Sequence, residues 1–149
     1  MKLLILTQVV DTVDSDLGFF VRWIEEFAKH CEKVTVICLR EGEHAALARV
    51  RVYPLGSGSR LSRAFRFLRC IIALRREYSS VFVHMNPEYV ILGGPFWSVW
   101  GKRIAIWYTH KSVNAKLRLA ALWSDVILTA SKESFRLRSN KVRVMGHGI

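Results

Sequence analysis

The sequence predicts an α/β fold, namely a doubly wound, Rossmann-like parallel sheet of about seven strands with helices on both faces. Two observations lead to this prediction. Short apolar runs alternate along the whole chain with longer segments of helical period. The apolar runs are mostly continuous, which is typical of strands buried on both faces of a parallel sheet. Right-handed crossovers through the helices would join such strands.

Strands are expected at the short runs of apolar, often β-branched residues. These runs are Leu3–Leu6, Lys33–Leu39, Val50–Leu55, Val81–His84, the middle of Lys102–Lys111, Asp125–Thr129 and Val142–Met145. Val50–Leu55 alternates between apolar and polar residues more strongly than the others, so we place it at an edge of the sheet.

Helices are expected between these strands, where apolar residues recur with a helical period. They are Leu17–His30, Leu61–Tyr78, Pro87–Trp100, Asn114–Trp123 and Ser131–Arg138. Ser15 or Asp16 is suited to cap the first helix, and Ser131 the last, because such side chains accept a hydrogen bond from the first turn. Pro87 suits the first turn of its own helix.

The helix expected from Leu61 is rich in arginine. Leu61, Phe65, Leu68 and Ile72 form one apolar stripe, and six arginines are spread over the other faces. The simplest interpretation is a solvated outer surface. The alternative is contact with anionic lipid or a lipid-linked phosphate through Arg63, Arg66 and Arg69. Nucleic acid is not expected, because Phe65 belongs to the stripe and does not interleave with the basic residues as a base-stacking aromatic would.

Composition limits the classes of function. The chain of 149 residues has a net charge of +11, which favours anionic partners. Its three cysteines form no C-x-x-C pair, so we expect a reducing compartment and no metal site. No signal peptide is evident, and the most apolar stretch, Tyr89–Gly101, is too short to span a bilayer. The expected location is cytoplasmic.

The clearest candidate site follows the strand within Lys102–Lys111. Its apolar middle gives way abruptly to Tyr108, Thr109, His110 and Lys111. Ligands of open parallel sheets bind just beyond the carboxyl ends of the strands. The sequence therefore predicts an active-site element here, although an ordinary polar loop would give the same pattern.

Other segments are expected at the same edge of the sheet. They are the loop after Thr7 and the segment His84-Met85-Asn86. Gly18 stands at the start of the first helix, where backbone N–H groups can face an anion. The chain has no G-x-G-x-x-G, Walker loop, G-x-S-x-G or H-E-x-x-H motif, so those sites are not predicted.

Taken together, several segments resemble the N-terminal half of a GT-B fold glycosyltransferase, of the family 4 group that uses nucleotide-sugar donors with retention. The resemblance covers essentially the whole chain. Its carriers are Gly18-Phe-Phe-Val-Arg-Trp-Ile-Glu-Glu-Phe-Ala, Lys33-Val-Thr-Val-Ile-Cys, Val81-Phe-Val-His84, Thr109-His110, Ser124-Asp-Val-Ile-Leu-Thr-Ala-Ser131-Lys-Glu and Val144-Met-Gly-His-Gly-Ile149. One departure is that Leu17 precedes Gly18 where the family usually has two adjacent glycines.

The resemblance implies roles for particular residues. His110 would be catalytic, at the reaction centre, and Gly18 would approach the donor phosphates. His84, Asn86, Tyr108 and Lys111 are the other expected substrate contacts. The final Gly-His-Gly-Ile resembles the start of the crossover into a second, donor-binding domain, which we expect to lie outside these residues. The chain would then be either a fragment of a longer enzyme or a protein that has lost this domain.

The implied protein is therefore a hexosyltransferase-type enzyme of glycan biosynthesis that needs a second domain for activity. Its N-terminal domain would bind a glycan or lipid-linked acceptor, and the nucleotide-sugar would be the donor substrate, with no cofactor. The positive charge is compatible with a peripheral place at the inner membrane face. The alternative function is a non-catalytic Rossmann-like module that binds anions or a membrane surface.

Overall fold

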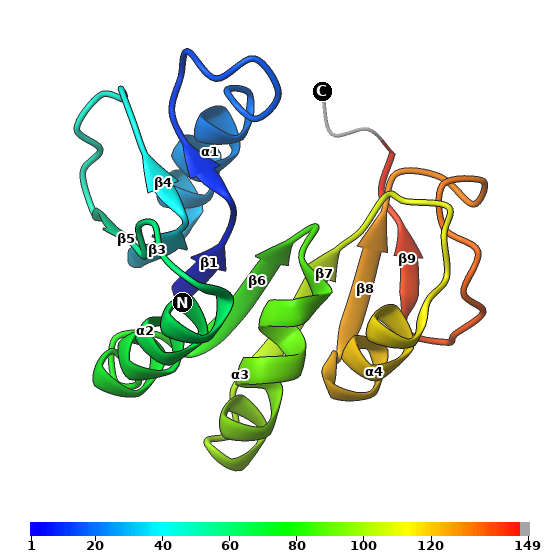
Figure 1. The fold of residues 1–149 in the computed structure, drawn as a ribbon. Helices are drawn as coiled ribbons and strands as arrows, with labels where there is room; N and C mark the ends of the chain where they lie inside the picture. Colours follow the sequence, from blue (N-terminus) through cyan, green and yellow to red (C-terminus); the bar gives the residue numbers. More distant parts are fainter. Residues whose placement is uncertain (147–149) are drawn as a thin grey trace. The chain divides into compact units, whose positions relative to one another are not determined.

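The computed structural model describes residues 1–146, which form two compact units (Figure 1). The first unit is Met1–Ser80, and the second begins at Val81. The seven main strands of the described residues divide between them, three in the first and four in the second. The predicted α/β class with about seven parallel strands is confirmed.

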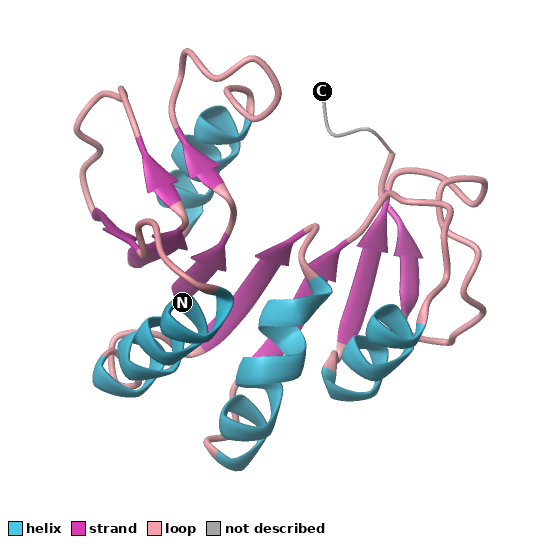
Figure 2. Ribbon diagram, in the orientation of Figure 1, coloured by secondary structure: helices cyan, strands magenta, loops and turns pink. Residues whose placement is uncertain are grey.

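The first unit is built on three parallel strands in the order β5-β3-β1. They are β1 (Lys2–Leu6), β3 (Lys33–Cys38) and β5 (Val50–Pro54). β5 lies at the edge, as its alternating sequence predicts. The helices α1 (Phe20–His30) and α2 (Arg60–Ala73) lie on opposite sides of these strands (Figure 2). Continuous apolar runs in β1 and β3 are buried because a helix covers each face.

A second, very short parallel pair was not predicted. It joins β2 (Val9–Val10) to β4 (Arg40–Glu41) beyond the carboxyl ends of β1 and β3. Two residues are too few for a detectable sequence period. The pair ties the two loops together, with Gly42 N donating to Val10 O at 2.9 Å.

The start of the first helix differs from the prediction. The helix begins at Phe20, three residues later than expected, and neither Ser15 nor Asp16 caps it. Asp14 holds the preceding turn instead, because its Oδ1 accepts from the N–H groups of Asp16 at 2.9 Å and Leu17 at 2.7 Å. Asp14 is thereby satisfied locally, and residues 17–19 stay in turns.

The side of the second helix that faces the core is not the apolar stripe seen in the sequence. Phe67 and Ile71 are the buried residues of α2, whereas Leu61 and Phe65 are exposed. Ser59 caps the helix by accepting from Ser62 N at 3.2 Å. The helix ends at Ala73, before the predicted Tyr78.

The second unit carries the strands in the order β6-β7-β8-β9. They are β6 (Ser80–His84), β7 (Arg103–Trp107), β8 (Val126–Thr129) and β9 (Val142–Val144). The helices α3 (Pro87–Val99) and α4 (Ala115–Trp123) lie side by side on one side of these strands (Figures 1 and 2).

Two glycines let α3 pack closely. A Cβ placed on Gly94 would lie 2.7 Å from Cβ of Trp123 in α4, so only a glycine allows the two helices this approach. A Cβ on Gly93 would meet the ring of Trp97, which is fully buried. The glycines that weaken the prediction of this helix from propensity are therefore explained by its packing.

The last predicted helix is absent. Ser131 does accept from Ser134 N at 3.1 Å, as a capping residue would, but the chain forms only one turn and then runs without regular structure to 139. Phe135 is buried and packs edge-to-face on Tyr108, with ring centroids 6.0 Å apart. Burial of this ring outweighs the weak helical tendency of the segment.

Within residues 1–146, no helix combines the length and the apolar character needed to cross a bilayer. Most of the terminal Gly-His-Gly-Ile, which we interpret as the start of a crossover, lies outside the described residues.

Candidate functional site

The carboxyl ends of β6 and β7 meet at one edge of the second unit. Met85 N donates to Trp107 O at 2.8 Å, so the segment after β6 stays paired with β7 for one more residue. Tyr108 N donates to Leu128 O at 2.9 Å and extends the pairing with β8 in the same way. The first residue after each of these strands is therefore held by the sheet.

Met85 has a left-handed backbone with a φ of 67°. This conformation is uncommon for a residue other than glycine, costs of order 1 kcal/mol or more, and clusters at functional sites. Here it turns the chain sharply from β6 into α3, which begins two residues later at Pro87. The same turn brings the Met85 side chain to within 3.5 Å of the Thr109 hydroxyl.

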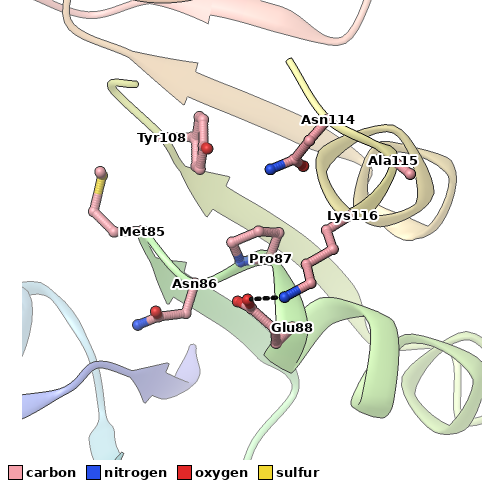
Figure 3. A pocket seen from close by; sticks show the side chains of 8 residues that line it. All are labelled: Met85, Asn86, Pro87, Glu88, Tyr108, Asn114, Ala115 and Lys116. Carbon is pink, nitrogen blue, oxygen red and sulfur yellow. Dashed lines mark hydrogen bonds and ion pairs between the residues drawn. The ribbon is translucent and has the colours of Figure 1, made fainter. Parts of the chain in front are cut away.

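An open cavity of about 400 Å³ lies at this edge. Its walls come from the end of β6, the residue after β7, and the first turns of α3 and α4 (Figure 3). The lining residues are Met85, Asn86, Pro87, Glu88, Tyr108, Asn114, Ala115 and Lys116. Only Asn86 and Tyr108 of this set were singled out from the sequence.

An ion pair spans the two helices at the cavity. Lys116 Nζ donates to Glu88 Oε1 at 3.2 Å, as Figure 3 shows. Both side chains are about half exposed, so the pair adds little to stability and a ligand can replace it at low cost. Sequence reasoning missed this pair because its members are 28 residues apart and each looks like an ordinary first-turn residue.

Two amide side chains that line the cavity are held by hydrogen bonds to the backbone. Asn86 Nδ2 donates to His84 O at 3.2 Å. Asn114 caps α4 by accepting from Leu117 N at 2.9 Å. The N-termini of α3 and α4 both face this region and add partial positive charge. The cavity thus combines amides, a carboxylate, an ammonium and a phenol, which can donate to and accept from several hydroxyl groups at once.

His110 lies beside the cavity without lining it. Its ring centroid is 6.3 Å from that of Tyr108, and its side chain is exposed, as a ligand-reachable histidine must be. Ser112 N donates to Nδ1 at 3.2 Å. Because Nδ1 accepts this bond, the neutral ring carries its proton on Nε2, which is then a hydrogen-bond donor. Lys111 next to it is also exposed.

His84 lies in the interior of the second unit and is not among the lining residues. Its side chain is buried, and burial lowers the pKa of His84 to about 4. The ring is therefore neutral at neutral pH. Its direct link to the site is its carbonyl oxygen, which positions Asn86.

Gly18 belongs to the first unit. Its N–H donates to Asp14 O at 3.1 Å, and a Cβ at this position would lie 2.6 Å from that same oxygen. The glycine is thus required by the tight turn. Its contact with a donor phosphate, and a common rim with His84 and His110, stay predictions.

The three predicted arginine contacts differ in α2. Arg69 is exposed. Arg66 folds back on the preceding loop and donates to the carbonyl oxygens of Ser57 and Ser62. Arg63 is half buried, and its Nε has no hydrogen-bond partner within the described residues.

In residues 1–146, no group of three His, Cys, Asp or Glu side chains is arranged to hold a metal ion. The cysteines at 31, 38 and 70 are free thiols. Burial raises the pKa of Cys38 to about 12, so this thiol is a poor nucleophile.

Comparison with solved structures shows the fold. The chain is similar to Anabaena Alr3699/HepE, solved in complex with UDP, with a TM-score of 0.63 and 13% identity over all of this chain. It is also similar to the UDP-GlcNAc 2-epimerase of Methanocaldococcus jannaschii, with a TM-score of 0.57 and 15% identity over 97% of this chain. Both are GT-B-like proteins, so the domain has a GT-B-like fold.

The chain spans 44% and 45% of the length of these two proteins. No family profile matches the sequence, and no curated protein sequence matches it. The comparisons therefore show the fold of the chain and do not assign it to a family.

Proposed function

We propose that this chain is the acceptor-binding half of a retaining, family 4-like glycosyltransferase that uses a nucleotide-sugar. The observation that carries the proposal is the cavity at the ends of β6 and β7, with exposed His110 beside it, in a GT-B-like domain. One of the similar proteins was solved with UDP and the other acts on a UDP-sugar by its name. A nucleotide-sugar is accordingly the donor class that we propose here.

The chemistry of the cavity suits a sugar acceptor. The Glu88 carboxylate accepts from a hydroxyl group while the Lys116 ammonium donates to its neighbour, so one diol can replace the ion pair. The two charges cancel, which favours an uncharged, polyhydroxylated ring over an anion. Asn86 and Tyr108 supply further polar contacts from the sheet edge.

In the proposed reaction, an acceptor hydroxyl oxygen bonds to the anomeric carbon of the donor. The bond from that carbon to the phosphate oxygen breaks, the nucleoside diphosphate leaves, and the hydroxyl proton passes to a base. His110 has its proton on Nε2 in the neutral ring, so we assign it the task of orienting a sugar hydroxyl or phosphate oxygen by donating a hydrogen bond. We do not assign it the proton abstraction.

A binding experiment on the chain 1–149 tests the acceptor site. Amide chemical shifts are followed by NMR while neutral mono- and oligosaccharides are added. We expect saturable shifts at Met85, Asn86, Glu88 and residues 114–116, and at least about a tenfold weaker affinity in the double variant Glu88→Gln, Lys116→Gln. The matched control is Glu26→Gln, Lys29→Gln, an exposed ion pair in the first unit.

Two outcomes contradict the proposal. One is that no saccharide shifts the cavity residues in a saturable way. The other is that the control variant weakens binding as much as the cavity variant does.

An assay of sugar transfer tests whether these residues are sufficient for the proposed reaction. Since the chain spans less than half of its structural neighbours, we expect purified 1–149 to transfer no sugar from nucleotide-sugars to acceptor mixtures. Robust turnover that disappears in His110→Ala would instead place the whole reaction in these 149 residues.

A further inference from the structure

Helix α2 presents an apolar row to solvent. Leu61 is 84% exposed, Phe65 63% and Ile72 39%. The first two are four residues apart and the third follows seven residues later, so all three lie along one side of the helix. We call these three residues the ridge. Single exposed apolar residues are common, but a row over three turns of one helix is a candidate interaction surface.

Only positive charge accompanies the ridge on its own helix. From Arg60 to Arg76 the chain has six arginines and no Asp or Glu. Arg69 is exposed and lies one turn from both Phe65 and Ile72, which places its guanidinium along the ridge. Arg60 is exposed at the first residue of α2, and Arg76 is exposed in the turn that follows the helix. A partner that covers the ridge therefore meets arginine on its margin.

Contacts within the first unit hold α2 in its helical form, so it does not need a partner in order to fold. Ser59 caps it, and Arg66 ties its second turn to the preceding loop through Ser57 O. Phe67 and Ile71 anchor the opposite side in the core of the first unit. A surface that is already folded loses little conformational entropy on binding.

We propose that the ridge, with Arg60, Arg69 and Arg76, docks the protein on the surface of an anionic phospholipid bilayer. An apolar row bordered by arginine is the composition of helices that lie in the membrane interface, with apolar side chains among the acyl chains and cations at the phosphates. A protein partner would have to offer a long acidic rim, whereas an anionic bilayer offers negative charge on every side of the ridge. The charge of the whole chain, +11, favours the same surface.

Co-sedimentation of the chain 1–149 with vesicles tests this proposal. We expect binding to vesicles that contain about one third phosphatidylglycerol and little binding to pure phosphatidylcholine. Binding should weaken when NaCl rises from about 0.1 M to about 0.5 M, because salt shortens the range of exposed charges.

Two double variants separate charge from apolar contact. Arg69→Gln, Arg76→Gln should lower the partition coefficient about 30-fold, at about 1 kcal/mol for each arginine. Its matched control is Arg136→Gln, Arg138→Gln, which removes the same charge from exposed positions of the second unit and should have a much smaller effect. Leu61→Ser, Phe65→Ser should weaken binding about tenfold or more, since the side chains no longer enter the apolar layer.

The control for the apolar variant is Val99→Ser, Leu122→Ser, two residues that are equally exposed in the second unit. Thermal unfolding of each variant confirms that it is folded. The proposal is overturned by equal sedimentation with neutral and anionic vesicles, by a ridge variant that binds normally, or by controls that lose as much as their partners. Displacement from vesicles by short duplex DNA at equal charge, with loss in the same ridge variants, would reassign the surface to nucleic acid. None of these results depends on saccharide binding at the cavity.

Discussion

The loops at the carboxyl ends of β1 and of β6 use their polar groups in opposite ways. After β1, the groups satisfy one another. The buried carboxylate of Asp11 accepts from Val13 N at 3.0 Å and Glu43 N at 3.3 Å, and Arg40 bridges it to Asp14. Gly42 packs directly against this carboxylate, since a Cβ at that position would lie 2.2 Å from Oδ2.

After β6 and β7 the polar groups surround a cavity. Glu88 and Lys116 are paired at the surface, and Asn86 and Tyr108 line the wall between them and the sheet. The acidic residues are also distributed unevenly along the sequence. Residues 1–80 hold nine of the twelve acidic residues, whereas residues 81–149 hold three.

The two loops differ in whether their polar groups have partners within the chain, and this difference indicates where a ligand can bind. Polar residues that satisfy one another within the chain stabilise a loop, and their removal should cost stability. Polar residues that face an open cavity with weak internal partners are available to a ligand, and their removal should cost binding.

The largest effect is expected at Asp11. Asp11→Ala removes the acceptor for two backbone N–H groups and one end of the Arg40 bridge, so we expect a loss of about 2–3 kcal/mol in the free energy of unfolding. Urea unfolding measures it. Glu88→Ala is the matched variant in the second unit and should lose less than about 0.5 kcal/mol. Equal losses in the two variants would remove the contrast between the loops.

The next effect is the pH dependence caused by His84. Burial depresses its pKa from 6.5 to about 4. The unfolded chain therefore binds a proton more readily than the folded one, and the stability is complete above pH 6.5 and falls as the pH drops toward 4. The loss attributable to this group is about 2 kcal/mol at pH 5.

Urea unfolding of the wild type and of His84→Gln between pH 7 and pH 5 isolates this term. The variant should lose less stability than the wild type over that interval. Parallel pH profiles would show that His84 is not the group responsible.

The smallest effect has the opposite sign and belongs to the first unit. His44 has a raised pKa because Glu41 Oε1 lies 2.7 Å from its Nε2, and Ala45 O lies 2.9 Å from its Nδ1. The stabilisation by His44 is complete below pH 6.5 and is lost as the pH rises through the folded pKa. An NMR titration of the His44 ring should give a pKa above the ordinary value, and Glu41→Gln should lower it. A ring that titrates normally in both proteins would contradict this.

Most of the strands could be predicted because burial on both faces leaves a strong signal. The segments 33–38 and 81–84 are rich in apolar, β-branched residues, and the structure has β3 and β6 there. The helix α2 shows what such a pattern leaves open. Its sequence contains two apolar rows with helical spacing, and only the packing decides that Phe67 and Ile71 face the core. Periodicity identifies a helix but does not choose between two apolar sides.

The site was predictable only in part. The rule that ligands bind beyond the carboxyl ends of parallel strands pointed to the segments after β6 and β7, and with them to Asn86, Tyr108 and the exposed His110. The rule could not identify Lys116, because that residue reaches the cavity only through the packing of α4 against α3. The one available signal was its position in the first turn of a helix after a strand end, next to the capping residue Asn114.

The contact of Gly94 with Trp123 has a consequence for how this cavity can change. Glu88 and Lys116 lie on the same two helices that this contact holds together, so the width of the cavity depends on Gly94, a buried residue six positions after Glu88. A methyl group at position 94 must push α4 outward, because the atoms it meets belong to the Cβ and ring of Trp123 rather than to a flexible chain end. The size of the cavity can therefore change through the spacing of two helices, while every residue that lines it is left as it is.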